Sequence, residues 1–118
     1  MSIASSRQQS RHLPAFILLA LAEVPLHGGA LQAALNKSLP TLKADSAAIY
    51  RTLKTLEKDG EVRGEWDMSG SGPAIKIYSL TPAGWDKLDL WLEDVRARMQ
   101  NLTYFVEAHS RLKRPRLE

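Results

Sequence analysis

The chain has 118 residues, with 44% hydrophobic and 25% charged residues, which favours one soluble globular domain over a disordered or fibrous chain. The absence of cysteine excludes disulfides and thiolate metal sites and fits a cytoplasmic location. The formal net charge of +3 is too small to identify a nucleic-acid-binding protein by itself.

The first elements expected along the chain are an arm and an apolar helix. Residues 1–12 are polar and lack an apolar period, so we expect a mobile N-terminal arm there. The apolar run over residues 13–24 is shorter than the roughly 20 residues that cross a bilayer. It predicts a buried helix, with Pro14 in its first turn, and no membrane partner. After the break at "PLHGG", a second helix is expected over residues 29–37.

A third helix is predicted by its own start and stop signals. Asp45 is a suitable N-cap, and Gly60 is a suitable residue just after the C-terminus. Between them Ile49, Leu53 and Leu56 recur at spacings of four and three residues, which gives one apolar face. The exposed side is expected to present Ser46, Tyr50, Arg51 and Lys54.

Two short strands joined by a glycine-rich loop are predicted next. Residues 61–66 and 74–80 alternate apolar and polar side chains, and "DMSGSGP" lies between them. A glycine loop that cradles a phosphate runs from a strand into a helix, whereas this loop runs from strand to strand. We therefore interpret it as the tip of a β-hairpin, which either contacts a DNA backbone or is simply solvated. For the first alternative, the candidate contacts are Ser69, Ser71 and Lys76.

A long C-terminal helix gives the most regular pattern in the sequence. Thr81 and Pro82 are a typical N-cap and first helical residue. Apolar residues then recur at alternating spacings of three and four, which is typical of a coiled-coil seam that a second copy would cover. We expect the helix over residues 82–109 and a basic, disordered tail over 110–118. The expected dimerisation residues are Trp85, Leu88, Leu92, Val95, Met99, Leu102 and Val106.

The order of these elements predicts a winged helix-turn-helix, a mostly α fold with a small β-hairpin and a long C-terminal dimerisation helix. The DNA-binding domain would span residues 13–81, and its third helix would enter the major groove of double-stranded DNA. Arg51 suits a bidentate contact with guanine, whereas Lys43 and Lys54 suit phosphates. Tyr50 fits the DNA face and half-buried packing equally well.

No catalytic, metal or other cofactor site is predicted. The sequence has no recognisable nucleophile arrangement, and its acids are scattered singly along amphipathic segments. No second histidine or acid stands at metal-ligand spacing from His12 or His109. We interpret His27 as a helix-entry or core residue and expect Trp66 to pack against its neighbours. The protein is therefore not expected to be an enzyme.

Three segments resemble the PadR family of winged-helix transcriptional regulators: "ILLALAEVPLHGG", "IYRTLKTLEKDGEV" and "WDMSGSGPAIKIYSLTPAG". The resemblance covers residues 13–108 and implies a transcriptional regulator. Together with the seam of the long helix, it leads us to expect a homodimeric repressor whose two third helices meet the half-sites of an inverted repeat. Its likeness to drug-binding members implies that Trp85 and Trp91 wall a pocket for a small-molecule inducer, with ordinary helix packing as the alternative. The wing looks most like the subgroup described as polyhydroxybutyrate-responsive repressors.

The start of the third helix departs from the family pattern. Ala47 and Ala48 stand where the family often has a glycine and a threonine, so an operator sequence cannot be carried over from relatives. This departure leaves a second function open. The chain would then be a protein–protein interaction module that uses its long helix and binds no specific DNA.

Overall fold

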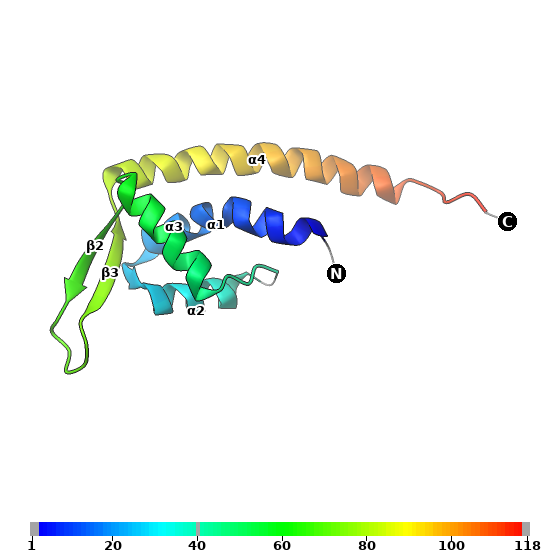
Figure 1. Cartoon of the computed structure of the whole chain (residues 1–118). Helices are drawn as coiled ribbons and strands as arrows, with labels where there is room; N and C mark the ends of the chain where they lie inside the picture. Colours follow the sequence, from blue (N-terminus) through cyan, green and yellow to red (C-terminus); the bar gives the residue numbers. More distant parts are fainter. Residues whose placement is uncertain (1–2, 40, 117–118) are drawn as a thin grey trace. The chain divides into compact units, whose positions relative to one another are not determined.

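The structure, a computed structural model, describes residues 3–39 and 41–116. The chain forms two compact units, Met1–Leu88 and Asp89–Glu118. The first unit holds three helices and a small sheet, and the second consists of the rest of the last helix, α4 (Pro82–Ser110), and the chain that follows it (Figure 1). The prediction of a mostly helical fold with a long C-terminal helix is confirmed.

The core of the first unit lies between three helices: α1 (Ile3–Glu23), α2 (Gly28–Ser38) and α3 (Ser46–Lys58). Each helix buries residues that recur every three or four positions, because that spacing places them on one side of a helix. The buried apolar face predicted for α3 is confirmed. The helical core residues include Ile17, Leu18, Leu21, Leu31, Leu35, Ile49, Leu53 and Leu56.

Helix α1 is longer than the sequence indicated. It begins at Ile3, so residues 3–12 are helical and the predicted helix start at residue 13 is corrected, while the mobility of this segment stays a prediction. Residues 1–2 lie outside the described residues. Pro14 is inside the helix rather than in its first turn, and its missing N–H removes one i→i−4 hydrogen bond. A polar segment can extend a helix that is already anchored by its apolar part, since propagation costs less than nucleation.

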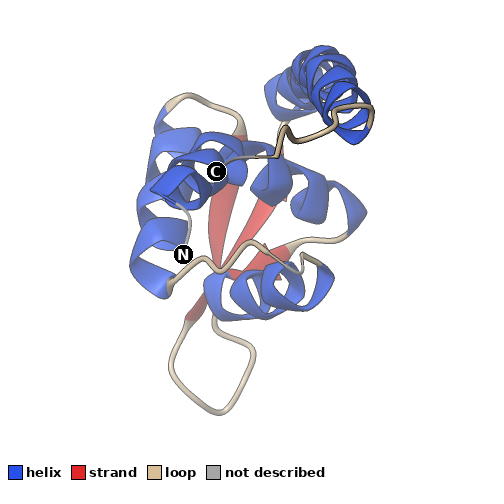
Figure 2. Ribbon diagram, turned by 90° about the vertical axis from the view of Figure 1, so that its right-hand side faces the viewer, coloured by secondary structure: helices blue, strands red, loops and turns tan. Residues whose placement is uncertain are grey.

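The sheet has three strands, so the predicted hairpin is part of a slightly larger sheet. Strands β2 (Val62–Asp67) and β3 (Ile75–Leu80) are antiparallel, and β1 (Leu26–His27) pairs with the other side of β3. The two-residue β1 lies in the "PLHGG" break, which gives no strand signal. Helix α1 contacts β3 and α3 contacts β2, while the loop between β2 and β3 extends beyond the helices (Figure 2).

Helix α4 begins where the sequence predicted and ends at Ser110, one residue beyond the expected end. Thr81 caps it by accepting a hydrogen bond from the Gly84 amide at 3.1 Å. Residues 111–116 form neither helix nor strand, and the rest of the expected tail lies outside the described residues. No helix within the described ranges is long and apolar enough to cross a membrane.

Candidate nucleic-acid interface

Helix α3 is fixed at both ends by local hydrogen bonds. At its start the Asp45 carboxylate accepts from the Ala48 amide at 2.8 Å, so the predicted N-cap is confirmed. At its end Gly60 has a φ of +77°. The Gly60 and Glu61 amides donate to the carbonyls of Glu57 and Leu56, the arrangement of a Schellman motif. The direction and length of the helix are therefore set by its own sequence.

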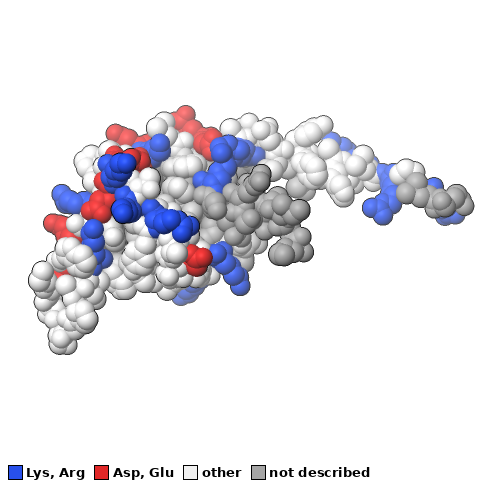
Figure 3. Space-filling view, in the orientation of Figure 1, with Lys and Arg blue, Asp and Glu red and all other residues white. Residues whose placement is uncertain are grey.

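The outer face of α3 carries the predicted contact residues. Tyr50 is 50% exposed, and Arg51 and Lys54 are exposed as well. Among the described residues, no carboxylate forms an ion pair with Arg51 or Lys54. Basic side chains gather over the part of the surface where α3 lies, with acidic ones between them (Figure 3). Ser46, at the first turn, is exposed too. This face can therefore offer cationic donors to a polyanion without first breaking an internal ion pair.

Tyr50 also joins α3 to the start of α2. A Cβ on Gly28 would overlap the Tyr50 ring, so the phenol lies directly against the glycine backbone. Next to it the His27 side chain caps α2, because its Nδ1 accepts from the Ala30 amide at 3.3 Å. The interpretation of His27 as a helix-entry residue is confirmed. Tyr50 thus combines half-buried packing with an exposed edge on the α3 face.

Lys43 lies on the connection between α2 and α3, which is held at two points. Leu42 is buried, and the Gln32 amide Nε2 donates to the Ala44 carbonyl at 3.1 Å. Lys43 itself is exposed beside the N-terminus of α3. Residue 40, in the same connection, lies outside the described residues. A lysine so placed can extend its ammonium toward a phosphate beside the first turn of α3.

The loop between β2 and β3 is the wing tip, which we define as residues 68–74. The Ser69 hydroxyl and amide both donate to the Asp67 carboxylate, at 2.6 and 2.9 Å. These hydrogen bonds lower the pKa of Asp67, so this acid is ionised beside the tip at neutral pH. Ser71 is exposed. Ser69 can still accept a hydrogen bond, but donating to a phosphate would mean giving up its bond to Asp67.

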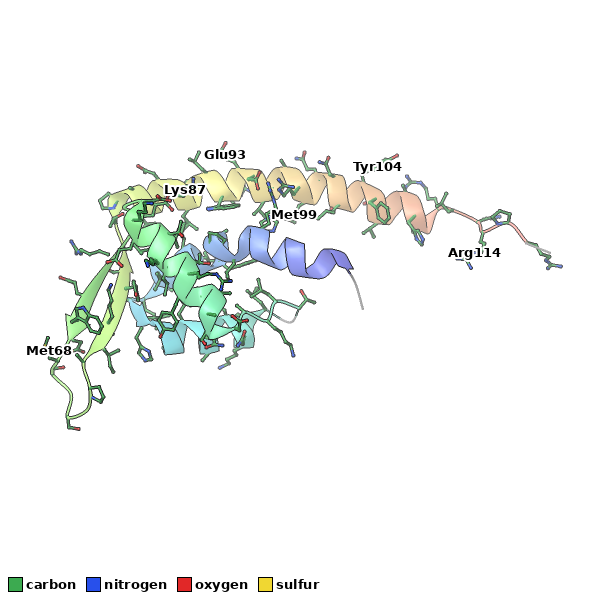
Figure 4. All side chains as sticks on the ribbon, viewed as in Figure 1. Met68, Lys87, Glu93, Met99, Tyr104 and Arg114 are labelled. Carbon is green, nitrogen blue, oxygen red and sulfur yellow. The ribbon has the colours of Figure 1, made fainter. Side chains whose placement is uncertain are left out.

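Two apolar side chains on the hairpin are unexpectedly exposed. Met68 lies at the start of the wing tip and is 75% exposed (Figure 4). Trp66 is 62% exposed, so the packing expected for it is limited to one side of the ring and does not place it in the core. It lies opposite Lys76, and the Lys76 ammonium is 5.9 Å from the centre of its ring. The alternation of apolar and polar residues in β2 continues past the part of the strand that α3 covers. The pattern therefore indicates more burial for Trp66 than the structure has.

Lys76 is engaged within the protein. Its ammonium lies 3.1 Å from a carboxylate oxygen of Glu57 and 5.4 Å from the centre of the Tyr78 ring. The hydrogen bond to Glu57 raises the pKa of Lys76, while burial raises the pKa of the Tyr78 phenol. Sequence reasoning overlooked Glu57, since nothing in the pattern indicates that it pairs with a residue 19 positions later.

Helix α4 exposes most of its predicted seam. Leu88 and Val95 are half-buried, whereas the remaining seam residues are 48–66% exposed. Toward the end of the helix the aromatic side chains of Tyr104 and Phe105 are 69% and 67% exposed. Tyr104 and Met99 can be followed along α4 in Figure 4. Apolar side chains exposed along a long helix stabilise that helix only when another surface covers them. The exposed seam residues are Trp85, Leu92, Met99, Leu102 and Val106.

Trp85 and Trp91, the proposed pocket walls, are six residues apart on α4. Side chains at that spacing point about 120° apart around a helix, so one copy does not stack them on each other. Trp85 is 50% exposed and Trp91 is half-buried. In the described part of the chain, no group of three or more His, Asp or Glu residues is placed to hold a metal ion.

Comparison with known proteins places this geometry among transcription factors. The profile described as "Transcriptional regulator PadR-like family" matches residues 17–90. A structure described as a potential transcription factor is 33% identical, with a TM-score of 0.67, over 88% of this chain and 95% of its own. A transcriptional regulator from Clostridium thermocellum has a TM-score of 0.74 at 20% identity, over 90% of this chain and 98% of its own, and so supports the fold alone.

One similar structure contains DNA. It is Bacillus subtilis PadR in complex with operator DNA, with 29% identity and a TM-score of 0.64. The likeness covers 70% of this chain and 46% of the Bacillus protein, so this chain spans less than half of that relative. A comparison with curated protein sequences gives no match.

Proposed function

The chain belongs to the PadR-like family of transcriptional regulators, and from this premise we propose that it is a homodimeric, sequence-specific DNA-binding repressor. The family is one of regulators rather than enzymes. The observation that carries the proposal is the outer face of α3, where exposed Arg51 and Lys54 have no ion pair among the described residues. The DNA complex of the Bacillus relative supports it.

In this proposal α3 lies in the major groove of double-stranded DNA. The forked guanidinium of Arg51 reads guanine, the specific contact for which arginine is best suited. Lys54 and Lys43 bind phosphates on either side, which fixes the register of the helix without reading sequence. Tyr50 and Ser46 complete the α3 contacts, while Ser69 and Ser71 approach a backbone from the wing tip. The protein would act in the cytoplasm, where this DNA is accessible.

Two copies would pair along the α4 seam. The exposed apolar residues of α4, from Leu92 to Val106, support this pairing because they leave a long helix without a covered face. A two-fold dimer would present two α3 helices to half-sites about one DNA turn, roughly 34 Å, apart. The operator would accordingly be an inverted repeat.

A small-molecule inducer would act by changing the spacing of the two α3 helices. Trp85 and Trp91 are the proposed walls of its pocket, and their 120° separation on one helix favours a pocket that needs side chains of both copies. The wing sequence supports membership of the subgroup described as polyhydroxybutyrate-responsive repressors. That subgroup name identifies no ligand for this chain.

The test is a fluorescence-anisotropy titration of the full chain, with the duplex upstream of its own gene beside a scrambled duplex. We expect tight binding to the native duplex alone. The logarithm of its affinity should fall linearly with the logarithm of salt concentration. The slope should be about −0.9 for each phosphate contacted. Equal, weak binding to both duplexes would contradict an operator at this position, and no binding at low salt would contradict the proposed function.

A second candidate is a protein–protein interaction module. The exposed Tyr104 and Phe105 favour it, because large aromatic side chains are typical of protein interfaces. Such a module would bind a partner protein through an apolar surface with little response to salt. The salt series therefore separates the two candidates, whereas a mutation in the α4 seam would affect both.

A further inference from the structure

The wing and α3 are linked by one side chain. Lys76 lies on β3, in the second ladder pair from the wing tip. Its cross-strand partner is Trp66. Its ammonium is 3.1 Å from the Glu57 carboxylate, in the last turn of α3. The same nitrogen lies within 6 Å of the Trp66 and Tyr78 ring centres, which is the range of a cation–π contact.

Gly64 provides the path for this contact. It lies opposite Tyr78 in the ladder, on the same face of the sheet as the pair formed by Trp66 and Lys76. A Cβ on Gly64 would overlap the Lys76 stem and approach a Glu57 carboxylate oxygen to 3.3 Å. The lysine stem thus runs across the bare glycine toward α3. A larger residue at position 64 would displace it.

We propose that Glu57 and Lys76 form a positioning pair that fixes the wing relative to α3, and that this pair sets how the wing approaches DNA. The inference rests on the proposed function, because it assigns a role within the same DNA interface. It also changes the role first expected for Lys76. The lysine acts through its partner in the protein and is not a phosphate contact.

The composition of the wing tip supports this role. Residues 67–75 contain no lysine or arginine, and Asp67 is ionised there. The tip therefore has no cation of its own to draw it to a phosphate, and its neutral donors work only if they are held at the right place. Hydrogen bonds require heavy-atom distances near 3 Å, whereas a charge attracts over a longer range.

The positioning role and the phosphate role predict opposite effects of one substitution. If Lys76 contacts phosphate, Glu57→Gln releases the ammonium and removes a negative charge, so DNA binds more tightly. If the pair positions the wing, Glu57→Gln loosens the hairpin and weakens specific binding despite the lost negative charge. For a pair that is about one third exposed, we expect a loss of roughly two- to fivefold.

The experiment measures native-duplex affinity across a salt series for Glu57→Gln, Lys76→Met and the double variant. Each single variant should weaken binding by about two- to fivefold, and the double variant should be no weaker than the singles. The salt slope should stay unchanged, because no phosphate contact is lost. Glu65→Gln is the control, since it removes an exposed carboxylate from β2 without breaking this pair. It should leave binding unchanged or slightly tighter.

Tighter or unchanged binding by Glu57→Gln would overturn the proposal. A salt slope that is smaller in Lys76→Met, by the amount of about one phosphate contact, would overturn it as well. A second measurement needs no DNA. In the NMR spectrum of the free protein, Glu57→Gln should shift the Trp66 indole signal, identified with Trp66→Phe, and leave the Trp85 signal in place. An unmoved Trp66 signal would also overturn the proposal. If that signal moves but the unaltered protein binds no DNA, the proposed function is what fails.

Discussion

The winged unit and the outer part of α4 differ in how their apolar residues are covered. Within the described residues, every buried hydrophobic residue lies between Leu13 and Tyr78. Over residues 89–116 the apolar side chains are half-buried or exposed, and Leu102 and Val106 are 64% and 66% exposed. The first unit therefore has a core that can support folding by itself. The second unit is a helix whose exposed apolar residues can be buried only against a partner surface.

The largest expected effect follows from the core of the winged unit. Leu53→Ala removes a fully buried side chain of α3 and should lower the free energy of unfolding by about 2–5 kcal/mol. Urea denaturation followed by circular dichroism measures it. The loss should not depend on protein concentration, since the cavity lies within one copy. Leu112→Ala, at a 72% exposed site, is the control and should change little. A loss below about 1 kcal/mol for Leu53→Ala would contradict a well-packed core within one copy.

A substitution in the α4 seam should instead change how strongly two copies associate. Leu92→Asp places a charge in the proposed contact between two copies and should raise the dimer dissociation constant by about a hundredfold or more. Sedimentation equilibrium measures the effect, and the helical signal of the dissociated chain should fall as unpaired α4 frays. Asn101→Asp adds the same charge outside the seam and should remain dimeric. A fully dimeric Leu92→Asp protein would refute the seam.

A third substitution tests the junction between the sheet and the first turn of α4. A Cβ on Gly84 would overlap the Glu61 carbonyl oxygen, a backbone atom that cannot rotate away. Gly84→Ala should therefore destabilise the winged unit by about 1–3 kcal/mol, despite the better helix propensity of alanine. Thermal denaturation is the readout. Gly72→Ala, where a Cβ meets nothing within 4 Å, is the matched control. Equal melting temperatures for the two variants would contradict this packing.

The smallest effect is electrostatic. Partial burial raises the pKa of Glu61 above 4.5, although the Lys87 charge opposes the shift. The folded state therefore holds the Glu61 proton more tightly, so this carboxyl adds stability below pH 4.5 and loses that contribution as the pH rises through its folded pKa. Glu61→Gln should be more stable than the unaltered protein at pH 7, by less than about 0.5 kcal/mol. Urea denaturation at pH 7 and pH 4 tests this, and an advantage that grows toward pH 4 would contradict it.

The elements that sequence predicted well are those with local signals. The α3 boundaries follow from Asp45 and Gly60, whose hydrogen bonds reach only a few residues along the chain. Thr81 and Pro82 set the start of α4 in the same way. The alternating runs predicted both strands of the hairpin to within one residue at each end.

The features that sequence missed depend on contacts between distant positions. Strand β1 exists only because β3 lies beside it, and its two residues carry no periodicity. The pairing of Glu57 with Lys76, and the Tyr50 ring against Gly28, likewise join separate elements. Helix α1 shows a different limit, because the polar residues 3–12 carry no apolar period and yet continue a helix. The roles of the individual candidate contacts on α3 and the wing stay predictions.

The role of α3 as the DNA-reading helix is tested most directly by the ratio of affinities for native and scrambled duplexes. Anisotropy gives this ratio for Arg51→Ala and Lys43→Ala beside the unaltered protein. Arg51→Ala should lower the ratio by about tenfold or more, because it removes a base contact from α3. Lys43→Ala should weaken both duplexes alike and leave the ratio intact, because it removes only a phosphate contact. If neither variant changed affinity or ratio at physiological salt, the assignment of α3 as the DNA-reading helix would be wrong.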